Sequence, residues 1–385
     1  MSHLRLLRRI SFLVAVAITV FGVLPASANS ADPVLLNAQA LASLNTGYRV
    51  LLNGQTAEAL VPDRSEIGVK RTSAERSAAT LYRRDFNAQY GVHFTAIEVK
   101  LITTAFELNG STAVLHADEH VYMRFVSGWE TDPERDVTRM RIPHSFVFTQ
   151  TGRTWRLDFD DAGGMRDHGT AVDINPNLTP AQIRLQSSIG GGRLAVVDAE
   201  DPTALAVRPD GSTRVASAYG TYWPNPAGDY AYNWAYGRNP SYRNFSPDDC
   251  TNFMSQALRA GGWTDKLGFY WDWDNWWYND QNQTRSWTFV AAMRQFMSTS
   301  GRGQSLAYIN DLQKGDILQA DFGSNGSWDH GLMVDAKYSS NLYDIYVSYH
   351  DTDTQHRHMS DFLAVVQSTY GATTYNAWHI IATSN

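Results

Sequence analysis

Residues 246–262 read SPDDCTNFMSQALRAGG and hold the one cysteine of the 385-residue chain, Cys250. A capping serine or aspartate, a proline in the first turn and two glycines at the end predict a helix. Cys250 falls in its first turn, on one face with apolar residues at helical spacing: Phe253, Met254, Ala257 and Leu258. The positive end of the helix dipole favours thiolate, so we expect a lowered thiol pKa and a partly accessible nucleophile.

A histidine on a later strand offers the base that such a thiol needs. The structural alternative, a cysteine buried as a small apolar residue, is common among free cysteines. His330 begins a predicted strand, and a period of two puts it on one face with Leu332 and Val334. We expect that face to meet the nucleophile helix, which would bring Cys250 and His330 together as a thiol–imidazole pair.

A third group is needed to fix the tautomer of His330. Our first choice is His350, which ends the next predicted strand over residues 343–350, and the alternative is Asp351. Alternation puts Asp351 with the apolar residues of that strand and His350 with the polar ones, so the sequence leaves both open. Three further residues are expected to face solvent in the following loop: Asp353, His356 and His358.

The first 28 residues are expected to be a signal peptide. They carry three arginines, an apolar run over residues 10–24 and Ala26-Ser27-Ala28, which fits a cleavage site. We therefore expect a secreted or cell-envelope-associated protein with no membrane span after the signal is removed. The net charge of −7, without a basic cluster, argues against nucleic acid as a partner.

The rest of the chain predicts two domains of α+β class. Residues 33–162 begin with helices near 33–52 and 65–90 and continue as strands, with hairpin turns at Asn109-Gly110 and Thr151-Gly152. This order loosely resembles the cystatin-like or nuclear-transport-factor-2-like cone. Four histidines in it are expected to be structural or surface residues: His93, His116, His120 and His144.

Two further segments follow. Residues 163–225 are rich in glycine and turn signals, and we expect a linker that leaves the domains at variable distance. Residues 226–385 form the second domain, in which residues 263–287 hold six tryptophans. That tryptophan-rich segment is either a wall for binding sugar or peptide, or an insertion packed for stability. The front domain is either a separate module or a propeptide.

Residues from about 228 to 380 resemble the bacterial putative-amidase domain, which is related to NlpC-type and CHAP-type papain-like cysteine hydrolases. The strings that carry the resemblance are YGRNPSY at 236–242, DCTNFMSQAL at 249–258, KGD at 314–316 and DHG at 329–331. The resemblance implies a papain-like helix packed on an antiparallel sheet. It also implies Cys250 as nucleophile, His330 as base and His350 in the third polar place.

These observations predict a secreted cysteine hydrolase that cleaves amide bonds in cell-wall peptides or small amides. No metal or organic cofactor is expected. The backbone N–H of Cys250 is the expected oxyanion donor, with Tyr242 or Asn239 as a guess for a second one. The alternatives are a non-catalytic wall- or glycan-binding protein that uses the tryptophan-rich segment, and acyl transfer in place of hydrolysis.

Overall fold

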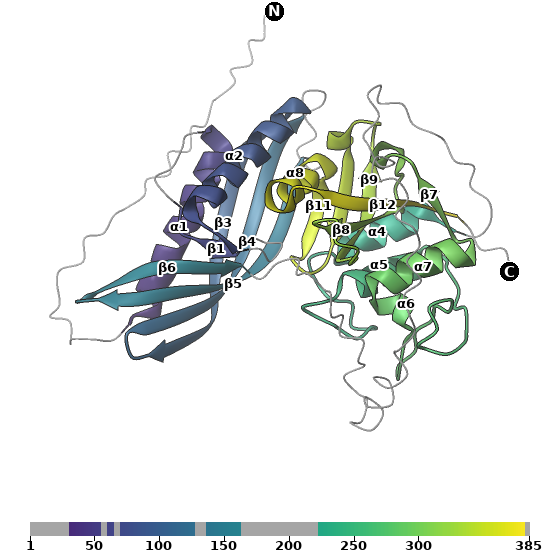
Figure 1. The fold of residues 1–385 in the computed structure, drawn as a ribbon, viewed down its shortest axis with the longest axis horizontal. Coiled ribbons are helices and arrows are strands. Elements are labelled where there is room, and N and C mark those ends of the chain that lie inside the picture. Colours follow the sequence, from purple (N-terminus) through teal and green to yellow (C-terminus); the bar gives the residue numbers. More distant parts are fainter. Residues whose placement is uncertain (1–30, 55–59, 65–69, 128–135, 163–221, 382–385) are drawn as a thin grey trace, which may run out of the picture.

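The computed structural model describes residues 31–54, 60–64, 70–127, 136–162 and 222–381. The predicted signal peptide and nearly all of the predicted linker lie outside these residues. The described residues form two lobes, each with helices packed on antiparallel strands (Figure 1). The fold class is α+β, as predicted.

Two helices cover the sheet of the front lobe. They are α1 (Pro33–Asn53) and α2 (Ser73–Gln89). The side chain of Asp32 accepts a hydrogen bond from the first turn of α1, and Thr72 with Glu75 forms a capping box at the start of α2. Each cap satisfies N–H groups that a helix start leaves without partners, so the local sequence fixes both starting points.

The front sheet is a meander of four long strands. They are β3 (Val92–Asn109), β4 (Thr112–Ser127), β5 (Val137–Thr151) and β6 (Thr154–Ala162), each antiparallel to the next. Both predicted hairpins are confirmed, with Gly110 and Gly152 at positive φ in the turns. Two short strands, β1 (Asp63–Arg64) and β2 (Lys70–Arg71), extend the sheet beside β6.

The second lobe places helices on both faces of its sheet. The helices are α4 (Pro224–Trp234), α5 (Cys250–Ala260), α6 (Arg285–Thr288), α7 (Val290–Ser300) and α8 (Met359–Tyr370), with short 3-10 turns at Ile309–Asp311 (η2) and Leu342–Asp344 (η3). The strands are β7 (Gly303–Leu306), β8 (Ile317–Phe322), β9 (His330–Lys337), β10 (Ile345–Tyr349), β11 (Thr354–His358) and β12 (Thr373–Ile380). Their order in the sheet is β11-β10-β9-β8-β12-β7.

Alternation along β9 decides which helix each side chain meets. Met333 belongs to the core cluster of α4, α5 and α7, whereas Leu332 and Val334 belong to the cluster of α8. The prediction that the face of Leu332 and Val334 meets the nucleophile helix is therefore wrong. Helix α8, which was not predicted from the sequence, forms a second helix layer that covers this apolar face.

The two lobes share one sheet, because β11 pairs with β5 through Thr354 and Gln355. Beside this pairing, α2 packs on α8, and Arg83 bonds the buried carboxylate of Asp361 at 2.7 Å. The expectation of a variable distance between the domains is therefore wrong for the described residues.

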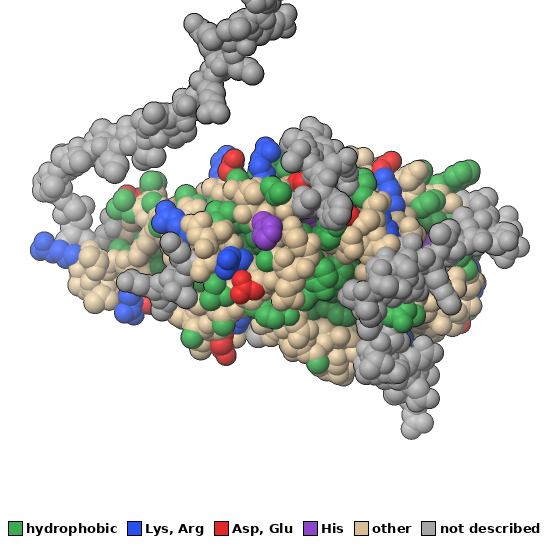
Figure 2. All heavy atoms as spheres, turned by 90° about the horizontal axis from the view of Figure 1, so that it is seen from above, with side chains coloured by type: hydrophobic (Ala, Val, Ile, Leu, Met, Phe, Trp, Pro, Cys, Tyr) green, Lys and Arg blue, Asp and Glu red, His purple; other side chains and the backbone are tan. Residues whose placement is uncertain are grey.

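The loop predicted after residue 350 is also different in the structure. Asp353, His356 and His358 are buried, not solvent-facing, because β11 forms there between β10 and β5. None of the described helices is long and apolar enough to span a bilayer. Charged side chains of both signs are scattered over the face shown in Figure 2.

Candidate active site

Three of the predicted site residues meet at the start of α5. The sulfur of Cys250, a ring nitrogen of His330 and a carboxylate oxygen of Asp351 all lie within 4.8 Å of one another. The Nδ1 atom of His330 is 3.3 Å from Oδ2 of Asp351. A thiol, an imidazole and a carboxylate in this arrangement have the composition of a nucleophile, a base and an orienting group.

Cys250 is the first residue of α5, and the strand beside it approaches the helix closely. A Cβ atom added to Gly331 would lie only 2.1 Å from the Cε atom of Met254. Glycine at position 331 therefore lets β9 pass close to α5 at the point where His330 begins the strand. This close approach brings the imidazole within reach of the sulfur.

The ring of His330 is held by aromatic neighbours from the α8 side of the sheet. Its centroid is 5.1 Å from that of Tyr349, edge-on, and 6.2 and 6.3 Å from those of Phe322 and Phe362. His330 itself is fully buried. Packing of this kind restricts the ring to one orientation, which a positioned base requires.

Asp351 lies in the tight turn between β10 and β11, with φ at 91°. Asparagine and aspartate tolerate positive φ better than other residues with a side chain, which suits an acid to this turn. Its Oδ1 atom accepts a hydrogen bond of 2.9 Å from the backbone N–H of Asp249, the residue before the nucleophile. One carboxylate thus joins the start of α5 to the imidazole of His330.

His350, our first choice for the orienting group, is placed elsewhere. Its Nδ1 atom is 2.6 Å from Oδ2 of Asp249, and its Nε2 atom is 3.0 Å from the backbone oxygen of Trp234. Because both ring nitrogens are engaged there, the structure puts the alternative, Asp351, beside His330. Side-chain alternation points the same way, since Asp351 follows the face of Ile345, Val347 and Tyr349, the face on which His330 lies.

Asp249 is the residue that the sequence analysis missed. Its buried carboxylate also accepts hydrogen bonds from the backbone N–H of Phe245 and from the amide of Asn252, and it pairs with Arg238 at 3.2 Å. Arg238 reaches Asp353 as well, at 2.8 Å. One guanidinium thus holds Asp249, whose N–H bonds Asp351, and Asp353, which follows Asp351 by two residues. The signal available in the sequence was the acidic pair directly before the cysteine.

The electrostatics of the sulfur differ from the prediction. Cys250 is only 3% exposed, and burial, helped by the charge of Asp351, raises the pKa of its thiol well above the usual value. Hydrogen bonds from the Gly331 backbone and from Thr251 act in the opposite direction but do not offset burial. The expected lowering by the helix dipole is therefore overturned, and the resting group is a protonated, buried thiol.

The same three donor atoms form a set that a metal ion could use. Zinc takes thiolate, imidazole and carboxylate ligands, and in a tetrahedral site they lie about 3–4 Å apart. The 3.3 Å between His330 and Asp351 fits that range. Cys250, His330 and Asp351 are thus the residues to which a metal test should be addressed.

The two guesses for a side-chain oxyanion donor are both engaged in other contacts. The amide of Asn239 donates to the hydroxyl of Tyr230, and the ring of Tyr242 packs against Tyr278 and Trp287. The backbone N–H of Cys250, at the first position of α5, belongs to the N–H groups that have no acceptor within their own helix.

The tryptophan-rich segment divides between the core and the surface. Three of its six tryptophans are buried in the core of the second lobe, namely Trp263, Trp276 and Trp287, and the other three are half-buried. Leu267 and Phe269 of the same segment are strongly exposed, at 77% and 65%. The packing interpretation accounts for three of the six tryptophans, and the segment also presents an exposed apolar edge.

Sequence comparison identifies the lobe that carries this site. Residues 221–376 match the family described as "Putative amidase domain". The resemblance predicted from the sequence is thereby confirmed for this lobe, and amide hydrolysis is supported at the level of the family.

Two curated relatives that match part of this chain are uncharacterized proteins from Bacillus subtilis (strain 168). YhbB is 35% identical over 116 residues, which cover 29% of this chain and 37% of YhbB. YjcM is 29% identical over 135 residues, which cover 32% of this chain and 29% of YjcM. The matches thus span about a third of each relative.

Solved structures similar to parts of the chain include two from other bacteria. A domain of unknown function with a cystatin-like fold from Nostoc punctiforme has 12% identity, a TM-score of 0.22, and covers 40% of this chain and 85% of that chain. An NTF2-like protein from Cytophaga hutchinsonii has 11% identity, a TM-score of 0.19, and covers 32% and 94%. The strand pairing within the front lobe itself defines its fold.

Proposed function

We propose that the amidase-family lobe is a thiol hydrolase in which Cys250 attacks the carbonyl of an amide. His330 acts as the base, and Asp351 is the group that orients it. The observation that carries the proposal is the convergence of these three side chains at the start of a helix, within 4.8 Å of one another. His350 is assigned a positioning role through Asp249, which it holds at 2.6 Å.

The chemistry follows from the protonated resting thiol. As the substrate carbonyl approaches Cys250, His330 takes the thiol proton and the sulfur forms a bond to the carbonyl carbon. The negative charge of Asp351 stabilises the imidazolium that results. The imidazolium then protonates the leaving amine as the C–N bond breaks. Water, deprotonated by His330, hydrolyses the thioester to a carboxylic acid and restores the thiol.

Burial of the sulfur adds a requirement to this mechanism. With Cys250 only 3% exposed, a substrate carbonyl reaches the sulfur only after neighbouring side chains move. Exclusion of water from the closed site strengthens the interaction between Asp351 and the imidazolium. Substrate binding thus has to open the site and to trigger the proton transfer.

The substrate class that we propose is a cell-wall peptide, including peptidoglycan stems, or another small amide. This proposal rests on the resemblance to cysteine hydrolases of bacterial walls and on the apolar edge at Leu267 and Phe269, which suits contact with a large substrate. It is accompanied by the proposal that the protein is secreted or associated with the cell envelope, because of the signal-like residues 1–28.

The proposal is tested by incubating the protein with purified peptidoglycan and with simple peptides, followed by mass spectrometry of the products. The matched control is a Cys250→Ala variant, which removes only the sulfur. We expect new amine and carboxyl ends from the wild-type protein alone. Added amines distinguish hydrolysis from acyl transfer, because a transferase would yield new amides. Identical product profiles from both proteins would exclude the hydrolase for these substrates.

A second candidate is a wall- or glycan-binding protein without turnover. The observations that favour it are the burial of Cys250 and the exposed side chains of Leu267 and Phe269. A binder of this kind would sediment with peptidoglycan and lose that association in a Leu267→Ser/Phe269→Ser variant. It would also show no difference between the wild-type protein and Cys250→Ala in any product assay.

A further inference from the structure

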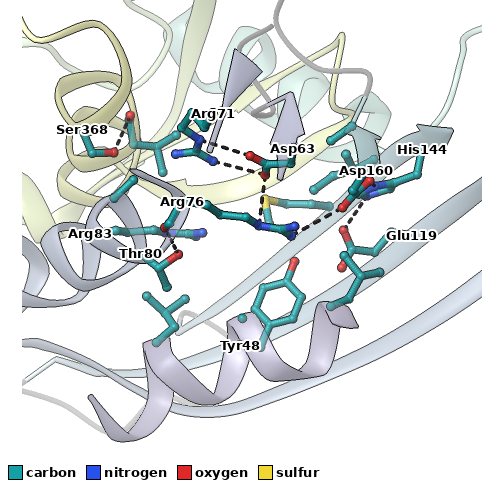
Figure 3. A pocket seen from close by; sticks show the side chains of 18 residues that line it. Tyr48, Asp63, Arg71, Arg76, Thr80, Arg83, Glu119, His144, Asp160 and Ser368 are labelled. Carbon is teal, nitrogen blue, oxygen red and sulfur yellow. Dashed lines mark hydrogen bonds and ion pairs between the residues drawn. The ribbon is translucent and has the colours of Figure 1, made fainter. Parts of the chain in front are cut away.

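A second chemically distinct site lies between the front lobe and α8, away from Cys250. A cavity of about 120 Å³ lies among α1, α2, strands of the front sheet and α8 (Figure 3). A dry cavity of about 150 Å³ in another protein is known to take up benzene, so this space suits a molecule of about one ring. Val365 and Ser368 of α8 line it, so the cavity is shared by both lobes.

One wall of the cavity is a network of buried charges. Asp63 pairs with Arg71 and Arg76, and Arg76 also reaches Asp160. Burial opposes protonation of His144, but Asp160 and Glu119 together outweigh it and raise its pKa to about 10, so the ring is a cation at neutral pH. Three carboxylates thus face three cations. The fourth cation of the lining, Arg83, is paired with Asp361, so the balance favours a neutral ligand over a charged one.

One buried acceptor atom in this wall, Oε1 of Glu119, has no hydrogen-bond donor among the described residues. Glu119 is a buried side chain, and its Oε2 atom is 2.9 Å from Nε2 of His144. Figure 3 shows Glu119, Arg76 and Tyr48 pointing toward the same space. A buried carboxylate oxygen requires a donor, because its desolvation is otherwise uncompensated.

The apolar wall of the cavity adjoins the charged one and includes a helix position kept open. Leu44, Leu51, Met140 and Ile142 line it and are all buried. Gly47, in the body of α1, also lines it, and a Cβ atom added there would meet nothing within 4 Å. Glycine inside a helix destabilises the fold by about 0.5–1 kcal/mol relative to alanine. At position 47 this lower stability coincides with the absence of a side chain that would occupy the cavity.

We propose that this cavity is a binding site for a small neutral alcohol or phenol. The hydroxyl group donates to Oε1 of Glu119, and the hydrocarbon body packs on the apolar wall. The site is independent of the hydrolase chemistry proposed above. Because α8 forms part of its lining, an occupant contacts both lobes at once.

Titration calorimetry and protein-observed NMR with phenol and toluene, two probes of nearly equal shape, test this site. We expect wild-type protein to bind phenol more tightly than toluene. In Glu119→Gln the preference for phenol should fall about tenfold, because the amide oxygen accepts only a neutral hydrogen bond in place of a charge-assisted one. In Gly47→Leu both probes should fail to bind, because the added side chain fills the cavity.

These variants distinguish binding in the cavity from non-specific binding elsewhere on the protein. Undiminished phenol binding by a folded Gly47→Leu protein would place the probe elsewhere and overturn the proposal. An unchanged phenol preference in Glu119→Gln would remove the carboxylate from recognition, and no binding of either probe by wild-type protein would rule the site out. If Glu119→Gln fails to fold, Gly47→Leu still decides, since leucine replaces a helix-weakening glycine.

Discussion

Replacement of Asp351 by asparagine should reduce turnover strongly while leaving the fold intact. Asparagine keeps the size of the side chain, tolerates the positive φ of this turn and retains an oxygen for the Asp249 N–H. What it removes is the charge 3.3 Å from Nδ1 of His330. At an effective dielectric constant of about 20, that charge stabilises an imidazolium by about 5 kcal/mol, so kcat should fall roughly 10³–10⁴-fold.

The assay is the rate of amide cleavage, followed by mass spectrometry, on a peptide that the wild-type protein hydrolyses. Asp280→Asn removes an exposed acid from the same lobe and serves as the matched control, with an expected rate near that of wild type. His350→Gln tests the other candidate for the orienting role. A rate for Asp351→Asn within a few-fold of wild type, together with a 10³-fold loss in His350→Gln, would refute the assignment and restore His350.

Four further predictions follow from charges and burial. Iodoacetamide labelling of Cys250, the one thiol of the chain, should keep rising through pH 9, because burial and Asp351 raise its pKa; a plateau below pH 7 would show a thiolate instead. Asp361→Asn should lower the free energy of unfolding in urea by about 3–5 kcal/mol, because it removes the buried carboxylate that pairs with Arg83 and Arg357. A change under 1 kcal/mol would contradict a stabilising contact between α2 and α8 at this position. The folded pKa of His144 is about 10 against 6.5 for the free side chain, so its stabilising effect is full below pH 6.5 and is lost as the pH rises to 10; a His144→Gln variant should lack this slope in thermal melts. A chelator should leave amide cleavage unchanged, whereas loss of activity that zinc restores would assign the Cys250 cluster to a metal.

Local signals made much of this structure predictable. The Asn109-Gly110 turn and the apolar spacing after Cys250 depend on neighbouring residues, and both formed as expected. The predicted start of the second helix at residue 65 is wrong, because α2 begins at Ser73, after the Thr72 cap. The pairing of β11 with β5 depends on residues more than 200 positions apart, and no local pattern encodes it. Strand β11 therefore read as a polar loop, because its charged residues find their partners only in the folded lobe, where His356 contacts Asp335 and Arg357 bonds Asp361.

In the candidate site, too, features set by local sequence were predictable and features set by long-range packing were not. Cys250 and His330 could be singled out because each begins an element whose local pattern is clear. The choice between His350 and Asp351 depended on which face α8 covers, and α8 was not foreseen. The thiol pKa was predicted with the wrong sign, because burial is a property of the packed molecule and outweighs the helix dipole.

The most direct test of the central claim is to trap the acyl-enzyme. Wild-type protein is mixed with a peptide that it cleaves, quenched in acid within one turnover, and examined by intact-mass and peptide-mapping mass spectrometry. The proposed thiol mechanism predicts an added mass equal to the acyl part of the substrate, located on Cys250 and absent from Cys250→Ala. Cleavage that continues in Cys250→Ala, with no adduct on the wild-type sulfur, would contradict it.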